Sequence, residues 1–379
     1  MNGVRVTVFS RHYAEYCYRY ALALSENCRV QLILDIDNVR DQFGSTELRS
    51  RDNLNIKMFR LRLKGTGLFH AVRATLATLR FRPHVVHFQE IPDVLHPIIQ
   101  RTVSPFARTA LTVHDPNPHS GSDSGLPSSV YRLQQRARES ADLLIVHGSR
   151  CHADLCNRMP HRIDRIIEST HGILMEPTAE AARSITKDPR MILCFGRMEH
   201  YKGICVLAEA AKLMTDRGID YRLVMAGRGP ELDKYQADLE SLPQVSVLNR
   251  WISAEEASEL YLQAGTIAMP YLNATQSGVA AAAVANRCAI VASRIGGLPD
   301  VVTDDVNGLL VEPGDAEGLA AALSRIVSDR ALGNRLRDGA AEAANVRLNW
   351  SRIARDLAPH FLQLADRPRS GSKSKTTQS

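Results

Sequence analysis

The stretch CFGRMEHYKG, Cys194–Gly203, decides how the rest of the chain is interpreted. An apolar run, Met191–Phe195, ends there at a glycine, and an amphipathic run follows. This pattern predicts a buried strand, a tight turn that carries Arg197 and Lys202, and the first turn of a helix. Helix-start N–H groups and two cations at one junction suit an anion, most naturally a phosphate. A solvated turn is the alternative, but the paired cations favour an anion site.

The same alternation of strand and helix extends in both directions from this stretch. It predicts an α/β fold with two doubly wound, Rossmann-like parallel sheets that face each other across a cleft. We expect an N-terminal domain over residues 1–180 and a C-terminal domain over 190–348, with the linker between Gly172 and Pro189. A last helix should span 349–366 and pack back toward the first domain, and the polar tail 367–379 should be disordered. Expected strands are Val4–Phe9, Val30–Asp35, Ile56–Arg60, Val85–Phe88, Thr109–Val113, Leu143–Val146, Ile166–Glu168, Met191–Phe195, Tyr221–Ala226, Val245–Leu248, Thr266–Met269, Ile290–Ala292 and Gly308–Val311.

Composition places the 379-residue chain among ordinary globular proteins. No apolar run reaches the roughly 20 residues that span a bilayer, and because a strand pattern starts within the first residues we expect no signal peptide. The seven cysteines contain no CxxC pair, so we expect reduced thiols and a cytoplasmic protein. Cys151, His152 and Cys156 have no second ligand pair at a suitable spacing, so we do not expect zinc.

The charge of +6 is unevenly distributed along the chain. Between Asn53 and Gln89 there is no Asp or Glu, and one predicted helix there combines an apolar stripe with basic residues. Such a helix can rest on anionic lipid. We favour the alternative, an ordinary surface helix packed on a sheet with solvated arginines. No aromatic or motif signal for nucleic acid accompanies the charge. The stripe is Leu68, Val72, Leu76 and Leu79, and the polar positions are His70, Arg73 and Arg80.

Three motifs in the second half occur in the order of a known family. They are FGRMEHYKG, YRLVMAGRGPE and the long run that begins MPYLNATQSGVAAAAVANRC. In the first half, LTVHD and ADLLIVHGS fit the same pattern. The chain therefore resembles the retaining glycosyltransferases of family 4, often called group 1, which have the GT-B fold. The resemblance covers the second half almost continuously and the first half in patches.

The resemblance implies roles for individual residues. Arg197 and Lys202 would hold the diphosphate of a nucleotide-sugar donor, together with the loop Ser277, Gly278 and Val279. Gly227 and Gly229 would lie beside the nucleoside, and Trp251 and Ile252 would contact its base. His114 would lie near the reacting sugar carbon, and Asp115 would hold its loop. A histidine at a strand end is often only structural, but a flexible loop, Asp115–Ser129, should follow this one.

Fixed cations and helix-start amides can stabilise a departing diphosphate without a metal. Asp35 and Asp37 form the D-x-D pair that holds Mg²⁺ or Mn²⁺ in metal-dependent enzymes, but they lie in the half expected to bind the acceptor. We therefore expect no metal and no cofactor.

Two departures from the family pattern concern carboxylates and the base pocket. Glutamates are common near Ala274 or Thr275 and near Ala282 or Ala283, where this chain has none. Asp300 replaces another usual glutamate, and Arg250 stands where glycine is common, so it should crowd the base pocket or reach the phosphates.

These observations leave several hypotheses open. The first is sugar transfer from a nucleotide-diphosphate donor to a hydroxyl acceptor, such as a lipid-linked glycan precursor at the inner face of the membrane. The second is a non-catalytic nucleotide-binding partner that has lost turnover. An epimerase lacks the acidic residues for proton abstraction, and a dehydrogenase lacks G-x-G-x-x-G after its first strand.

Overall fold

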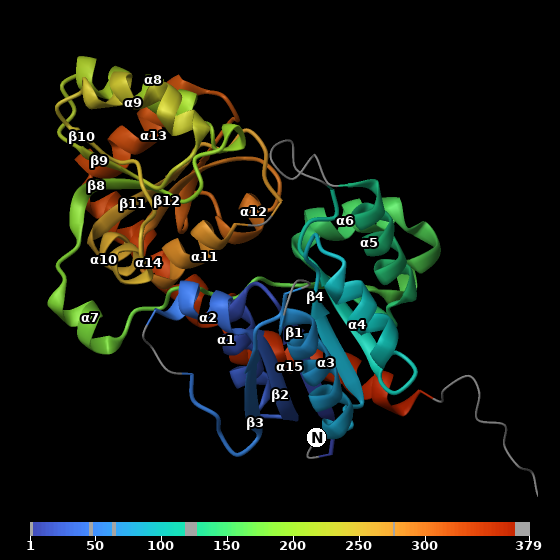
Figure 1. Ribbon diagram of the computed structural model, residues 1–379. Coiled ribbons are helices and arrows are strands. Elements are labelled where there is room, and N and C mark those ends of the chain that lie inside the picture. Colours follow the sequence, from blue (N-terminus) through green and yellow to red (C-terminus); the bar gives the residue numbers. More distant parts are fainter. Residues whose placement is uncertain (1–2, 45–47, 63–65, 118–126, 276, 368–379) are drawn as a thin grey trace, which may run out of the picture.

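The computed structural model describes residues 3–44, 48–62, 66–117, 127–275 and 277–367. Within them, two separate parallel sheets form the two lobes of the molecule (Figure 1). The first sheet has the order β3-β2-β1-β4-β5-β6-β7 and the second the order β10-β9-β8-β11-β12-β13. Both are doubly wound, so the predicted fold class is confirmed.

The five central strands of the first sheet are almost fully buried, as expected for parallel strands that are covered on both faces, whereas the edge strands β3 and β7 are partly exposed. They are β1 (Arg5–Ser10), β2 (Arg29–Asp35), β3 (Leu54–Phe59), β4 (Val85–Gln89), β5 (Arg108–Val113), β6 (Leu143–His147) and β7 (Ile166–Ser169). The helices are α1 (Ala14–Leu24), α2 (Ile36–Phe43), α3 (Thr66–Phe81), α4 (Leu95–Val103), α5 (Ser128–Ser140) and α6 (Gly148–Arg158), with a 3-10 turn η2 (Pro160–Arg165).

The second sheet is built in the same way. Its strands are β8 (Asp188–Phe195), β9 (Arg222–Ala226), β10 (Val245–Leu248), β11 (Ala264–Met269), β12 (Ala289–Ser293) and β13 (Gly308–Val311). Its helices are η3 (His200–Lys202), α8 (Ile204–Asp216), α9 (Pro230–Glu240), α10 (Ala254–Gln263), α11 (Gly278–Ala285), α12 (Leu298–Val301), α13 (Ala316–Ser328) and α14 (Arg330–Val346). Asp315 caps α13 by accepting a hydrogen bond from Gly318 N at 2.8 Å.

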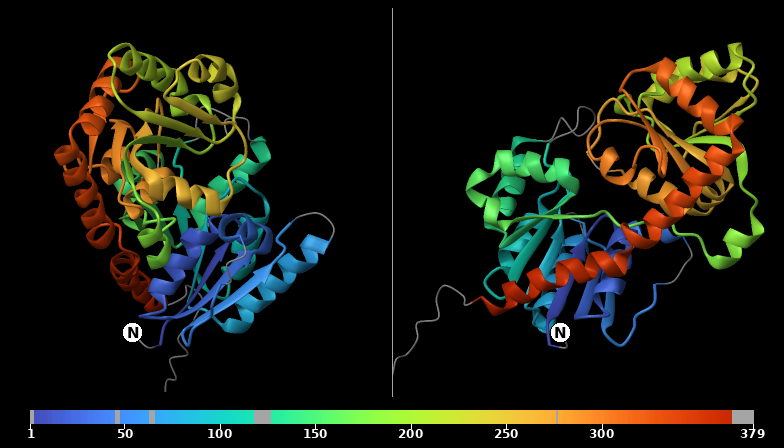
Figure 2. Two further views of the ribbon diagram at one scale, coloured as in Figure 1. Left: turned by 90° about the vertical axis from the view of Figure 1, so that its left-hand side faces the viewer. Right: turned by 180° about the vertical axis from the view of Figure 1, so that it is seen from behind.

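Two connections join the lobes. The segment after β7 contains the short helix α7 (Ala179–Ser184), and α15 (Trp350–Asp366) follows α14 and runs along the back of the first lobe (Figure 2). Trp350 fixes both segments, because its ring packs on Gly172 and its Nε1 donates to Ile173 O at 2.7 Å. On the first lobe, α15 packs beside α1, where Phe361 and Tyr20 are fully buried.

Alternate side chains of the first sheet pack on its opposite faces. Val8 and Leu32 pack with α1 and α15, whereas Phe9 and Ile33 pack with α3 to α6. All strands of this sheet run in the same direction, and their carboxyl ends point toward the second lobe. The loops that follow the strands therefore lie at the junction of the lobes (Figure 1).

Helix α3 packs on the sheet with most of its apolar stripe outward. Leu68, Val72 and Leu76 are 54%, 52% and 58% exposed, and Ala71 and Ala74 are buried against the sheet instead. The favoured interpretation, an ordinary surface helix packed on a sheet, is met through small residues, and the apolar stripe lies on the exposed side. Only Leu79 of the predicted stripe is partly buried against this core.

Candidate functional site

Lys202 is the centre of the turn after β8. It is 4% exposed, and its Nζ donates to Tyr271 Oη at 2.7 Å and to Phe195 O at 3.1 Å. Burial lowers the pKa of this ammonium. No carboxylate of the described residues lies within ion-pair distance of it. A buried ammonium with three protons and only neutral acceptors is suited to an anionic ligand.

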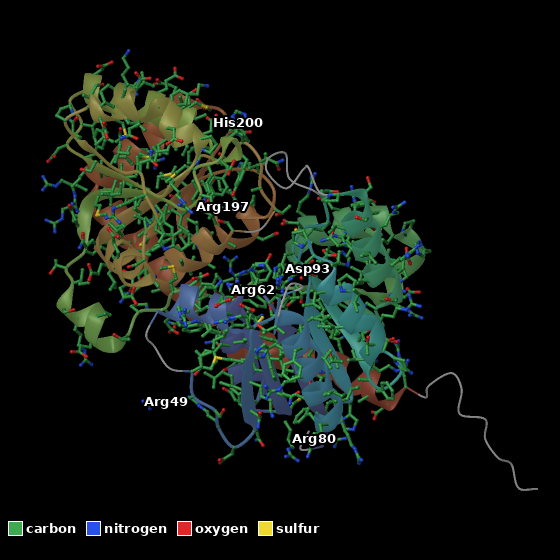
Figure 3. The ribbon with its side chains drawn as sticks, in the orientation of Figure 1. Arg49, Arg62, Arg80, Asp93, Arg197 and His200 are labelled. Atoms are coloured by element: carbon green, nitrogen blue, oxygen red, sulfur yellow. The ribbon has the colours of Figure 1, made fainter. Side chains whose placement is uncertain are left out.

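Arg197 lies in the same turn with its side chain exposed. Within the described part of the chain it forms no ion pair and no hydrogen bond through its guanidinium. Figure 3 labels it on the second lobe, with Arg62 and Asp93 at the end of the first lobe that faces it. Arg197 is therefore available to a ligand, whereas Lys202 is fixed by its neighbours.

The start of α11 lies beside this turn. Ser277 caps the helix by accepting from Ala280 N at 3.4 Å, and its hydroxyl also contacts Tyr271. A Cβ placed on Gly196 would lie 3.1 Å from Lys202 Nζ and 3.7 Å from Val279 Cγ2. Val279 therefore lies close to Lys202, and Ser277 contacts Tyr271, whose hydroxyl also accepts from Lys202. A diphosphate-binding role for Ser277, Gly278 and Val279 stays a prediction. Gln276 lies outside the described residues.

The loop after β9 packs directly on the same turn. Gly196 N donates to Ala226 O at 3.0 Å, and Met198 N donates to Arg228 O at 2.9 Å. Gly227 has φ +142°, and a side chain there would collide with the carbonyl of Gly196. A side chain at Gly229 would collide with Met198 O in the same way. Both predicted nucleoside-loop glycines are needed for this close approach of two backbones.

The segment after β10 completes this end of the second lobe. Trp251 is 64% exposed, and the guanidinium of Arg228 lies 5.8 Å from its ring centre. Ile252, the next residue, is buried in the core of the lobe. Arg250 forms a bidentate pair with Glu256 at 2.7 and 2.6 Å. In the absence of a ligand, the guanidinium of Arg250 is therefore bound to Glu256. That Arg250 crowds the base pocket or reaches the phosphates stays a prediction.

On the first lobe, His114 follows β5 and is nearly buried. Its Nε2 lies 3.0 Å from Gln89 Oε1, and the ring of Tyr13 stacks on it with 4.2 Å between ring centres. Burial lowers the pKa of His114 to about 3, with a further contribution from His171. The imidazole is therefore neutral at physiological pH, and this arrangement makes Nε2 the donor to Gln89 and leaves Nδ1 as an acceptor.

Asp115 joins the two lobes. The hydroxyl of Thr275, from the loop before α11, donates to its carboxylate. A second hydrogen bond between the lobes is donated by Ser149 Oγ to Asp300 Oδ1, at 3.0 Å. The contact between Asp115 and Thr275 brings His114 and Asp115 to the loop that begins α11. Thr275 is also one of the positions at which the family's glutamate is missing.

Three supporting residues could not be recognised from the sequence. Glu90 and Arg138 form a buried bidentate pair with both distances 2.7 Å, and Arg138 also donates to Asp115 O at 3.0 Å. Tyr13 caps α1 with φ +62°, an unusual conformation for a residue other than glycine. The loop 118–126 beyond Asp115, predicted to be flexible, lies outside the described residues.

Four histidines gather at the junction: His114, His147 and His171 contact the ring of Tyr16, and His87 packs on the neighbouring Tyr20. Burial lowers the pKa of His87 and His114 to about 3 and that of His171 to about 4, and it holds the pKa of His147 well below its ordinary value. His147 Nε2 lies 3.1 Å from Tyr16 Oη, and its ring centre lies 5.3 Å from that of His171.

We expect this cluster to make the fold sensitive to acid. Between pH 6.5 and the folded pKa values, the unfolded chain binds protons that the folded chain does not, so stability falls as pH falls. Each histidine costs about 1.4 kcal/mol per pH unit in that window. Four together cost up to about 5.6 kcal/mol per pH unit, which is comparable to the total stability of many domains. Urea unfolding at pH 7.5, 6.5 and 5.5 should show a steep loss below pH 6.5, and equal stability at pH 7.5 and 5.5 would contradict the prediction.

The D-x-D pair has structural partners. Asp35 caps α2 and accepts from Leu61 N at 2.7 Å, and Asp37 pairs with Arg62 and Arg60. Within the described residues, no three His, Cys, Asp or Glu side chains are grouped as metal ligands would be. Among the helices of the same described residues, none is both long enough and apolar enough to cross a membrane.

Comparison with known proteins agrees with this architecture. The chain is 28% identical over 264 residues to the D-inositol 3-phosphate glycosyltransferase of Corynebacterium urealyticum, a match that covers 65% of this chain and 62% of the relative. The chain spans about three fifths of the length of the curated relatives that it matches first.

Two solved structures share the fold over nearly their whole length. Sucrose-phosphate synthase from Thermosynechococcus elongatus superimposes with a TM-score of 0.71 at 18% identity, covering 95% of this chain and 99% of that one. The catalytic domain of starch synthase IV from Arabidopsis thaliana, bound to ADP and acarbose, also gives 0.71, at 14% identity and with 96% and 99% covered.

The family match lies on the second lobe, where the cation turn and the start of α11 meet. Residues 189–329 match the sequence model described as "Glycosyl transferases group 1". The C-terminal domain therefore belongs to the group 1 glycosyltransferase family, on a chain with the GT-B fold.

Proposed function

We propose that this chain transfers a sugar from a nucleotide-diphosphate donor to a hydroxyl acceptor, with retention at the anomeric carbon. The observation that carries the proposal is the buried Lys202, which lies beside Arg197 and the start of α11 without a carboxylate partner among the described residues. A diphosphate supplies the negative charge that this arrangement lacks.

In the proposed reaction, the bond between the anomeric carbon and the diphosphate oxygen breaks, and its electron pair stays on the diphosphate. Lys202, Arg197 and the amides at the start of α11 stabilise that charge. The acceptor oxygen bonds to the anomeric carbon from the same face, and its proton passes to a phosphate oxygen. His114 contacts the sugar as a neutral imidazole and Asp115 holds the loop. Gly227, Gly229, Trp251 and Ile252 contact the nucleoside.

No metal is needed in this proposal, because the protein's own cations and amides hold the leaving group. The Asp35 and Asp37 carboxylates, already bound by backbone N–H groups and arginines, support the same conclusion. Turnover should therefore be unchanged by EDTA, and a loss of turnover that Mg²⁺ or Mn²⁺ restores would contradict metal independence.

A non-catalytic nucleotide-binding partner is the second candidate. It is favoured by one observation: Ala282 and Ala283, near a usual glutamate position, are buried among apolar side chains in α11. No carboxylate from that helix can then reach a sugar hydroxyl.

One screen separates the two candidates. The purified chain is heated with UDP, GDP or ADP, and the nucleotide that raises the Tm is then supplied as a panel of nucleotide sugars while its release is measured. Saturation at 100 times Kd adds about 2.7 kcal/mol, enough for a shift of several degrees. Binding with turnover supports the enzyme, and binding without turnover for any sugar supports the partner. No shift with any nucleotide contradicts both.

We also propose that the acceptor is lipid-linked and that the chain acts at the inner, cytoplasmic face of a membrane. The support is the concentration of positive charge in residues 53–89.

A further inference from the structure

The outward face of α3 is apolar although it lies on the surface. Leu68, Val72 and Leu76 follow one another at intervals of four, and Phe69, beside them, is 63% exposed. The face that packs on the sheet consists of small residues, among them Ala71 and Ala74. Four large apolar side chains on one helix face exceed the single exposed residues that are normal on a protein surface.

The charge around this face has one sign. Neither α3 nor α4 contains an Asp or Glu, and the chain has none from 53 to 89. Arg73 and Arg80 flank the stripe, with the guanidinium of Arg73 lying 5.6 Å from the Phe69 ring centre. Arg80 lies at the end of the lobe away from the second lobe (Figure 3).

A basic cavity of about 540 Å³ lies next to the C-terminal end of α3. Leu79, Pro83, Ala365 and the exposed Phe106 provide its apolar lining, and no carboxylate side chain of the described residues lines it. Its basic lining is Arg5, Arg82, His84, Arg108 and Arg367.

We propose that the outward face of α3 docks on an anionic lipid bilayer, with its four apolar side chains in the acyl boundary and the arginines among the headgroups. A second copy of the chain is a poor partner for this face, because it would bring the same positive charge to the contact. The tail 368–379 has no large apolar residue and carries three cations, so it is not a suitable cover. The inference deepens the proposed membrane placement and does not depend on sugar transfer.

Flotation tests the proposal with vesicles of phosphatidylcholine alone or with 30% phosphatidylglycerol. Wild type should float with the anionic vesicles at low salt and much less with neutral ones. Because an arginine near such a surface contributes about fivefold in partition, Arg73→Gln with Arg80→Gln should lower binding about 30-fold. The triple change Leu68→Gln, Phe69→Gln and Leu76→Gln should lower it at least as much.

The matched control changes three apolar residues that are equally exposed elsewhere, Ile163, Val306 and Val346, to Gln. This control should float like wild type. Wild type that stays with the soluble fraction, or a triple variant that floats unchanged, would overturn the proposal. So would a wild-type dimer that the triple variant dissociates. The nucleotide Tm shift, measured on the same preparations, shows separately whether the donor site is intact.

Discussion

Arg197→Ala should lower kcat for sugar transfer about 10²- to 10³-fold, the loss typical when one preorganised group at the developing charge is removed. The variant should unfold at nearly the same Tm as wild type, because the guanidinium is exposed and has no ion-pair partner within the described ranges. Changing Lys202 to Ala as well should abolish measurable transfer, but that change also leaves the Tyr271 hydroxyl without its buried partner.

Arg217→Ala is the matched control. Arg217 follows α8 on the same lobe and pairs with Glu317 on the surface, so its loss should change neither kcat nor nucleotide affinity measurably. If Arg197→Ala and Lys202→Ala together keep wild-type transfer and wild-type nucleotide binding, the diphosphate assignment fails.

His114→Asn should lower kcat by about 10²-fold or more with a smaller change in KM, because a group beside the reacting carbon acts mainly in the transition state. His87→Asn is the control. His87 is equally buried and belongs to the same cluster, but it lies within β4 rather than at the strand end. Both variants should lose stability, and only His114→Asn should lose transfer.

The pH dependence adds a second readout. Since burial keeps the pKa of His114 at about 3, wild-type kcat should show no inflection from this residue between pH 6 and 8. An inflection near pH 6.5 that disappears in His114→Asn would contradict a neutral imidazole, and equal transfer by His114→Asn and wild type would remove His114 from the site.

The fold could be predicted because its signal is local. Runs such as Leu143–His147 are apolar enough to be buried on both faces, and each is separated from the next by a helical pattern. The cation turn was equally visible, since Arg197, Lys202 and the glycines around them lie within ten residues.

What could not be predicted depends on pairing across the chain. Glu90 and Arg138 are 48 residues apart, and Asp115 and Thr275 are 160 apart. Neither pair has a sequence motif of its own. The face of α3 that packs on the sheet could not be predicted for a different reason. The periodicity of the sequence identified an apolar stripe, but Ala71 and Ala74, on another side of the helix, make the contact with the sheet.

The central claim concerns one pocket, and a crystal structure with the nucleoside diphosphate selected by the Tm screen tests it most directly. We expect the terminal phosphate within hydrogen-bond distance of Lys202 Nζ and of the backbone N–H groups at Gly278 and Val279, with the base beside Trp251. A diphosphate bound elsewhere on the chain, with Lys202 and the start of α11 making no contact to it, would contradict the account.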